Sequence, residues 1–304
     1  MKNLPVLISD YIDRLTEAYR ADPRMLSILR ILFALHVLVF PIDYQWIARV
    51  PGGFFHPVPG PFMLFSETPS LEFLICLEIV RAVLAIVLLV GFQTRIVSIA
   101  LAGILILGAG LTYSFGKVDH FILYETLPIA MAFAGWGARY SFDSRRQQGG
   151  ANGFPMFLWA TTVGFALWTA ALPKVLTGWL DPSRQATRGY VARDLADPVK
   201  LGPLTEFVGS IDYPLLWKAL DYATIFAEGW VILAVLVPAL FRFSILVILG
   251  FHAGVFLALG IDFADYLLVY AAFFAFPPRT WFRLMPRRRA KRRAGKPATV
   301  GQRT

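Results

Sequence analysis

The sequence LWTAALPKVLTGWLD, residues 167–181, places one lysine, Lys174, at the end of a long uncharged segment that begins near Phe154. Burying an ammonium group in hydrocarbon is costly, so Lys174 either extends to the membrane surface or is retained for chemistry. Pro173 has no backbone N–H and is expected to bend or end a helix at this point. The stretch therefore predicts a membrane helix that carries a lysine at its end.

The composition extends this interpretation to the whole chain. Of the 304 residues, 57% are hydrophobic and only 16% are charged, which is far too apolar for a soluble domain of this size. We predict an all-α fold, a polytopic membrane helix bundle. The single cysteine, Cys76, excludes an intramolecular disulfide, and the sequence has neither the spacing of a zinc site nor a glycine-rich phosphate loop.

Eight apolar runs are long enough to cross about 30 Å of hydrocarbon, so eight spans are expected. The sixth carries Lys218 and Asp221 near its start. The runs cover residues 25–43, 71–91, 95–114, 119–137, 154–175, 214–238, 243–260 and 264–282.

Both ends of the chain differ from the apolar runs. Residues 1–22 have apolar side chains at three- and four-residue spacing, which predicts an amphipathic helix in the headgroup plane. Asp22 and Pro23 are expected to cap and begin the next helix, at the start of a transmembrane domain covering 23–282. Residues 283–304 form a basic tail, expected to lie beside anionic lipid headgroups and not to bind nucleic acid.

Lysine and arginine predict the orientation, because they accumulate in cytoplasmic connections. With both termini in the cytoplasm, every connection follows this rule except the outer loop at 177–212. This loop is expected to form one or two short helices across the outer mouth, either as a lid or as a static cap. The chain is accordingly placed in the cell membrane, with Lys174 and His120 near its outer face.

Charged and imidazole side chains also occur within the spans, where they must face the bundle interior. A buried network that fixes helix packing is the favoured interpretation of them, ahead of direct catalysis. Glu78 and Arg81 are three residues apart, so they can pair with each other or with Arg30. The full set is Arg30, His36, Glu78, Arg81, Glu228 and His252.

Small residues form a stripe on each of the sixth and seventh spans, which predicts close approach of these two helices. The positions of Glu228 and His252 along the two spans further predict that their side chains are neighbours. The stripes consist of Ala219, Ala223 and Ala227, and of Gly250, Gly254 and Ala258.

Five motifs, in order between residues 25 and 278, resemble the horizontally transferred transmembrane (HTTM) domain, the membrane module of vitamin K-dependent gamma-carboxylases. The glutamate-bearing second span and the GFQTR that follows it are also similar to DoxX-type proteins. The motifs are RILFALHVLVFPID at 30–43, GFQTR at 91–95, KVDHFILYETLP at 117–128, ALPKVLTGWL at 171–180, and GFHAGVFLALGIDF at 250–263 following Glu228.

This resemblance implies a chemistry for two residues. A lysine in the place of Lys174 deprotonates a hydroquinone in the carboxylases, after which oxygen adds and the resulting strong base drives carboxylation of a glutamate. A histidine in the place of His120 assists by binding the quinone oxygen. Desolvation at an apolar helix end agrees with a lysine that acts as a base. The implied cofactor is a reduced quinone, bound against Trp168, Trp179 and Phe121 in one outer-facing cavity.

The sequence also departs from the carboxylases, which leaves several functions open. Pro173 stands where they carry a second basic residue, and no counterpart of their large extramembrane region follows the module. Carboxylation of a protein substrate is therefore not expected unless an extramembrane partner protein supplies that region. A quinol-dependent membrane enzyme, a non-catalytic scaffold, transport or immunity protein, and a DoxX-like quinone-linked subunit are the alternatives.

Overall fold

A computed structural model describes residues 4–41, 44–116, 121–145, 152–197 and 201–276. Within these ranges every regular element is a helix. The α-helices are α1 (Leu4–Ala18), α2 (Pro23–Val39), α3 (Leu71–Val90), α4 (Thr94–Tyr113), α5 (Ile122–Ala134), α6 (Gly153–Leu176), α7 (Ala186–Leu195), α8 (Thr205–Gly209), α9 (Pro214–Gly229), α10 (Val231–Ala234), α11 (Pro238–Leu259) and α12 (Tyr266–Ala271). Short 3-10 helices are η1 (Gln45–Arg49), η2 (Gly52–Phe54), η3 (Pro61–Leu64), η4 (Asp143–Arg145) and η6 (Ala272–Phe274).

The structure confirms the prediction of an all-α fold that contains long apolar helices. Four helices in the described ranges, α3, α4, α6 and α11, are long and apolar enough to cross a membrane. The other four predicted spans also contain helices, but these are shorter. Helix α2 has 17 residues and α5 has 13, while α9 breaks at Trp230 and α12 passes into a 3-10 turn. The structure therefore supports four crossings and does not confirm eight.

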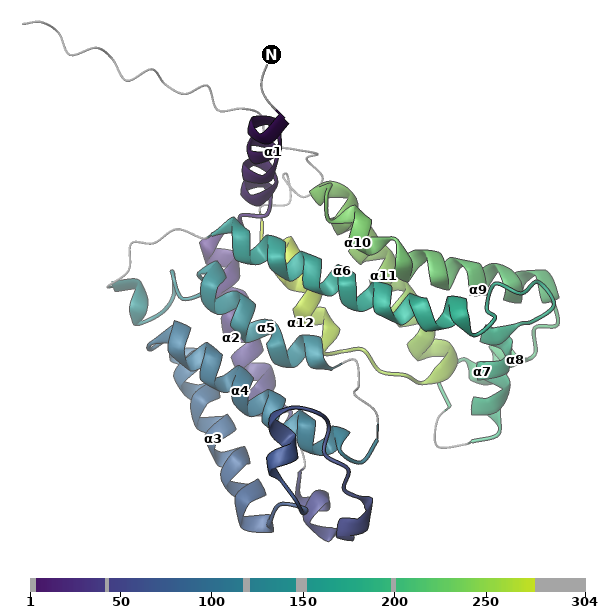
Figure 1. Cartoon of the computed structure of the whole chain (residues 1–304), viewed down its shortest axis with the longest axis horizontal. Helices are drawn as coiled ribbons and strands as arrows, with labels where there is room; N and C mark the ends of the chain where they lie inside the picture. Colours follow the sequence, from purple (N-terminus) through teal and green to yellow (C-terminus); the bar gives the residue numbers. More distant parts are fainter. Residues whose placement is uncertain (1–3, 42–43, 117–120, 146–151, 198–200, 277–304) are drawn as a thin grey trace, which may run out of the picture.

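The helices form two groups that meet along α5 and α6 (Figure 1). In one group α2 packs on α3, α3 on α4 and α4 on α5. In the other, α6 packs against α9 and α10, and α10 contacts α11. Helix α12 lies between the groups and contacts α2 and α5. The loop at 177–212 forms α7 and α8, in agreement with the short helices expected there.

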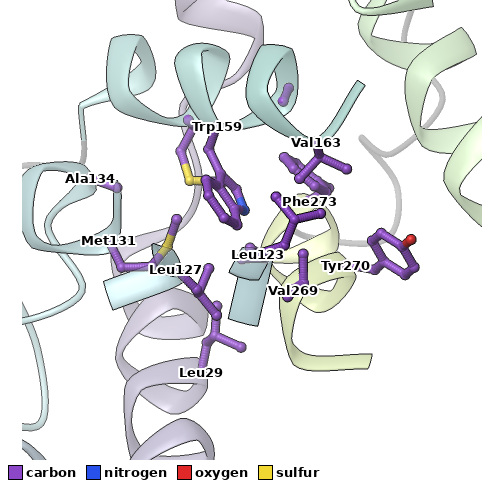
Figure 2. Packing of buried hydrophobic residues seen from close by; sticks show 14 of the residues in the cluster. Leu29, Leu123, Leu127, Met131, Ala134, Trp159, Val163, Val269, Tyr270 and Phe273 are labelled. Atoms are coloured by element: carbon purple, nitrogen blue, oxygen red, sulfur yellow. The ribbon is translucent and has the colours of Figure 1, made fainter. Parts of the chain in front are cut away.

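The main hydrophobic core lies where α2, α5, α6 and α12 converge (Figure 2). Leu29 of α2, Met131 of α5 and Trp159 of α6 point toward one another there, with Phe273 closing the cluster. These large side chains are almost completely enclosed by other parts of the protein. Because lipid chains are as apolar as these residues, close packing of the side chains stabilises the cluster more than removal from water does. This core holds the two helix groups together.

Long-range hydrogen bonds attach helix α1 to the segment between α10 and α11. Tyr11 and Tyr19 donate to the carbonyl oxygens of Leu236 and Val235, at 2.7 and 2.8 Å. Burial raises the pKa of Tyr19 well above its usual range, so the phenol stays protonated and keeps donating. Arg242 of α11 donates to the backbone oxygen of Ala18 at 3.0 Å. One face of the predicted amphipathic helix thus packs on protein.

The cap predicted at the start of α2 is present, and α4 has a second cap that the sequence did not predict. The Asp22 carboxylate accepts a hydrogen bond from the Arg24 N–H at 2.8 Å, and Pro23 begins α2, which confirms that prediction. The motif GFQTR forms the turn between α3 and α4. In it Asp143 accepts hydrogen bonds from the backbone N–H groups of Gln93 and Thr94, at 3.0 and 2.6 Å.

Replacing Gly91 by alanine is expected to destabilise the protein by about 2 kcal/mol, because this glycine ends α3 in the left-handed region at φ 74°. A methyl group there would also collide with the guanidinium of Arg30 and the side chain of Ser141. Thermal unfolding in detergent measures the effect. The control is Gly103→Ala in the middle of α4, where added atoms meet nothing within 4 Å. That variant is expected to gain roughly 0.5–1 kcal/mol, and equal stability of the two variants would contradict the prediction.

Candidate functional site

The lysine of the opening stretch forms an ion pair with a glutamate 54 residues away. The Nζ atom of Lys174, in the last turn of α6, lies 2.5 Å from Oε2 of Glu228 in α9. The side chain of Lys174 is 22% exposed and that of Glu228 only 7%. The sequence identified both residues but did not predict that they meet.

Local structure explains how Lys174 reaches this partner. Pro173 does not end the helix. Helix α6 continues beyond it and ends three residues later, at Leu176. The ammonium also lies 3.2 Å from the backbone oxygen of Ala170 and 5.6 Å from the ring centroid of Trp179. Lys174 is therefore held between its own helix, a carboxylate and the face of an indole ring.

A group of aromatic side chains surrounds His252. This imidazole of α11 stacks on Phe263 at a centroid distance of 3.9 Å, and the ring of Tyr270 in α12 is 5.9 Å away. Tyr270 also interacts electrostatically with Glu228. Direct contact between Glu228 and His252 stays a prediction.

The hydroxyl of Tyr270 is completely buried and has no hydrogen-bond partner among the residues that the structure describes. A buried hydroxyl without a partner costs about 1–3 kcal/mol, so such groups commonly mark a place where another polar group binds. This hydroxyl of α12 interacts electrostatically with Glu228, the carboxylate of the ion pair between α6 and α9.

The other residues of the predicted buried network occupy separate places. Arg81 pairs with Glu78 at 2.5 Å, which confirms one of the two expected pairings, and also donates to the backbone oxygen of Val37. Arg30 does not join them. Its guanidinium instead donates to the backbone oxygen of Tyr140 at 2.5 Å.

His36 makes a third, independent link. Its Nδ1 lies 2.9 Å from the hydroxyl of Tyr124 in α5, and its Nε2 lies 3.1 Å from Asp265, next to α12. His36 therefore connects α2 with two other elements. Because these contacts are distant from Lys174 in the chain and involve different helices, they are best described as ties between helices.

A second ion pair, which the sequence did not predict, attaches the outer loop. Lys218 lies 2.8 Å from Asp221 within α9, and also 2.8 Å from the backbone oxygen of Trp179. Asp221 in turn accepts hydrogen bonds from the backbone N–H groups of Ala186 and Thr187, at 3.0 and 2.8 Å. It thereby caps α7. The i, i+3 spacing of Lys218 and Asp221 was the available signal for their pairing.

The predicted close contact along the two small-residue stripes is wrong. An apolar cavity of about 700 Å³ lies between α9 and α11, lined by Ala223 and Ala227 on one side and by Gly250, Gly254 and Ala258 on the other. Methyl groups added at either glycine would meet no atom within 4 Å. Helices α9 and α11 do contact each other, but the cavity occupies the position of the stripes. Its wall also contains larger side chains, namely Trp217, Trp230, Phe243 and Phe251.

The remaining predicted site residues are not brought together around Lys174. His120 lies outside the described residues. Trp168 stacks on Phe165 of its own helix at 5.8 Å, and Phe121 lies at the start of α5. Two large cavities in the described ranges are lined by neither Lys174 nor Trp168 nor Phe121. Of the three expected aromatic walls, only Trp179 contacts the lysine.

A scan against protein-family models, a search of curated proteins and a search of solved structures each find no match. The class of the protein therefore rests on its own features. In the described ranges it is an all-helical protein with four helices long and apolar enough to cross a membrane, and a partly buried lysine–glutamate pair lies at the end of one of them.

Proposed function

We propose that this protein binds a lipophilic, ionisable molecule of the quinol class in the membrane, and that Lys174 and Glu228 together move its proton. The observation that carries the proposal is the 2.5 Å ion pair at the end of α6, whose carboxylate interacts electrostatically with a buried tyrosine hydroxyl that has no partner in the described chain. The resemblance to the HTTM domain implies that the same lysine takes part in deprotonation, but its pairing with Glu228 favours the carboxylate as the proton acceptor.

In this proposal Glu228 accepts the proton and Lys174 stabilises the resulting anion. A quinol hydroxyl transfers its proton to the Glu228 carboxylate, giving a neutral carboxylic acid and a quinolate anion. The Lys174 ammonium then stabilises the anion by charge and hydrogen bonding. The net charge of the site is the same before and after the transfer, which keeps the electrostatic cost low in surroundings of low dielectric constant. Tyr270 supplies a further hydrogen-bond donor.

The cavity between α9 and α11 suits the apolar part of such a molecule. Ala227 lines the cavity and directly precedes Glu228, and Thr224 lines it one helical turn earlier. The volume of about 700 Å³ lies within the range of ligand pockets. We place the apolar tail in this cavity and the ionisable head toward the pair.

The proposal also includes the number of membrane crossings and the orientation of the chain. Besides the four long apolar helices, the shorter helices α2, α5, α9 with α10, and α12 complete eight crossings. Both termini then lie in the cytoplasm, and Lys174 lies near the outer face of the cell membrane. The balance of lysine and arginine in the connections supports this orientation.

A non-catalytic scaffold is the second candidate, and one observation favours it. Lys174 and Glu228 tie α6 to α9 in the same way as Arg81 with Glu78, or Lys218 with Asp221, hold other parts together. In this alternative the pair contributes only to helix packing, and no lipophilic molecule depends on it.

Binding of a short-chain ubiquinol to the protein in lipid nanodiscs separates the two candidates. Removal of a charged hydrogen-bond partner weakens binding by about 1.5–3 kcal/mol, so Lys174→Met and Glu228→Gln should each bind the quinol at least about tenfold more weakly. Ala223→Phe, which fills the cavity, should also weaken binding. Glu78→Gln, in a different ion pair, is the matched control and should leave the affinity unchanged. Equal affinity in all four variants would contradict the proposal and favour the scaffold.

A further inference from the structure

A second cavity, of about 750 Å³, lies at the end of the bundle where α4 and α6 begin. Its walls come from α5, from the first turns of α4 and α6, and from the segment that follows α5. This cavity is separate from the lysine–glutamate pair and from the cavity between α9 and α11, because they share no lining residue. Residues that define it include Arg95, Ala130, Phe133, Phe154 and Leu158.

Arg95 is the cationic group of this cavity. Its guanidinium carbon lies 4.3 Å from the ring centroid of Phe133, which fixes the side chain over an aromatic face. Within the described ranges it forms no hydrogen bond or ion pair. The nearby Asp143 is engaged elsewhere, because its two carboxylate oxygens accept the backbone N–H groups that begin α4, and it interacts electrostatically with Arg30. The positive charge of Arg95 is therefore left for an external anion.

Apolar side chains form the outward-facing part of the cavity wall, and the rest of the wall includes polar residues, namely Thr94, Thr126, Asp143, Asn152 and Thr162. Ile129 and Phe133 on α5, and Phe154 and Leu158 on α6, are large hydrophobic side chains with substantial exposure. In a membrane protein this surface faces acyl chains. The first turn of α6 also borders the cavity and contains no acidic residue, so its helix dipole adds positive potential at the same end.

We propose that this cavity binds an anionic phospholipid, with the lipid phosphate on Arg95 and one acyl chain along the groove between α5 and α6. A guanidinium matches phosphate oxygens in geometry and charge, and it is held at the polar end of an apolar groove. The proposal is independent of the proposed quinol function, because it involves a different cavity and different helices.

Native mass spectrometry of the purified full-length protein in detergent tests the proposal by titration with phosphatidylglycerol or with phosphatidylcholine of the same acyl chains. One arginine near the headgroups contributes about 1 kcal/mol, so the protein should prefer phosphatidylglycerol about fivefold. Arg95→Gln should abolish that preference and Arg95→Lys should retain most of it. Ala130→Phe, which fills the groove, should weaken binding of both lipids.

The matched control is Arg193→Gln on α7. Arg193 is also exposed and also lies over an aromatic ring, that of Tyr190 at 4.8 Å, but its charge is already paired with Asp194 at 2.7 Å. The variant therefore removes one arginine from the surface without removing an unpaired cation. It should keep the preference for phosphatidylglycerol. Inorganic phosphate at millimolar concentration should not displace the lipid, since it lacks the acyl chain. Loss of preference in Arg193→Gln, an unchanged preference in Arg95→Gln, or displacement by phosphate would each overturn the proposal.

Discussion

Replacing Lys174 by methionine is expected to destabilise the protein by about 3 kcal/mol, since it leaves the Glu228 carboxylate buried without its partner. Removing one partner of a buried ion pair costs about 3–5 kcal/mol, and we expect a value at the lower end of this range because the lysine side chain is 22% exposed. Chemical denaturation of the detergent-solubilised protein, followed by circular dichroism, measures it. The loss should appear in the unfolding midpoint.

The double variant Lys174→Met with Glu228→Gln is the control for this prediction. Because it removes both charges, it should recover most of the lost stability. If the double variant is stable but binds no quinol, the pair has a chemical role beyond packing. A Lys174→Met variant as stable as the parent protein would show that the ion pair contributes nothing to folding.

Replacing Asp221 by alanine is expected to have an effect of similar or greater size, about 4 kcal/mol. Its side chain is 0% exposed, and its loss leaves Lys218 buried without a carboxylate and removes the cap of α7. Helices α7 and α8 should then detach from α9. Limited trypsin digestion should show rapid new cleavage at Arg188, in addition to the lower unfolding midpoint.

Asp212→Ala is the matched control for this loop. Asp212 also pairs with an arginine of α7, Arg188, at 2.9 Å, but its side chain is 82% exposed. An exposed pair contributes about 0–1 kcal/mol, so neither stability nor digestion should change much. Similar digestion of both variants would contradict the role assigned to the buried aspartate.

Short-range features of this structure could be predicted from the sequence. The cap at Asp22, the pairing of Glu78 with Arg81, and the two helices in the loop at 177–212 follow from local spacing, capping chemistry and loop composition. These features depend on residues a few positions apart, where helix geometry alone determines which side chains meet. The positions of the helices could be predicted from the apolar runs. Their lengths could not, because breaks such as the one at Trp230 depend on packing.

Contacts between distant segments could not be predicted in the same way. Lys174 was identified as the central residue, but its partner Glu228 is 54 residues away and was assigned to a different group. His36 and Asp265 likewise meet only because α12 lies between the two helix groups. The small-residue stripes failed for a related reason: whether such a stripe closes on its neighbour depends on the larger side chains around it.

The hydrogen bonds of α1 impose an order on assembly. Tyr11 of α1 and Tyr19 just after it donate to acceptors that lie 225 and 216 residues later in the chain. Helix α1 can pack on α6 once that helix has been made, but these two hydrogen bonds form only after residues 235 and 236 have been synthesised. A chain that is truncated or stalled before them would therefore hold α1 less firmly and leave it more open to proteases and quality control.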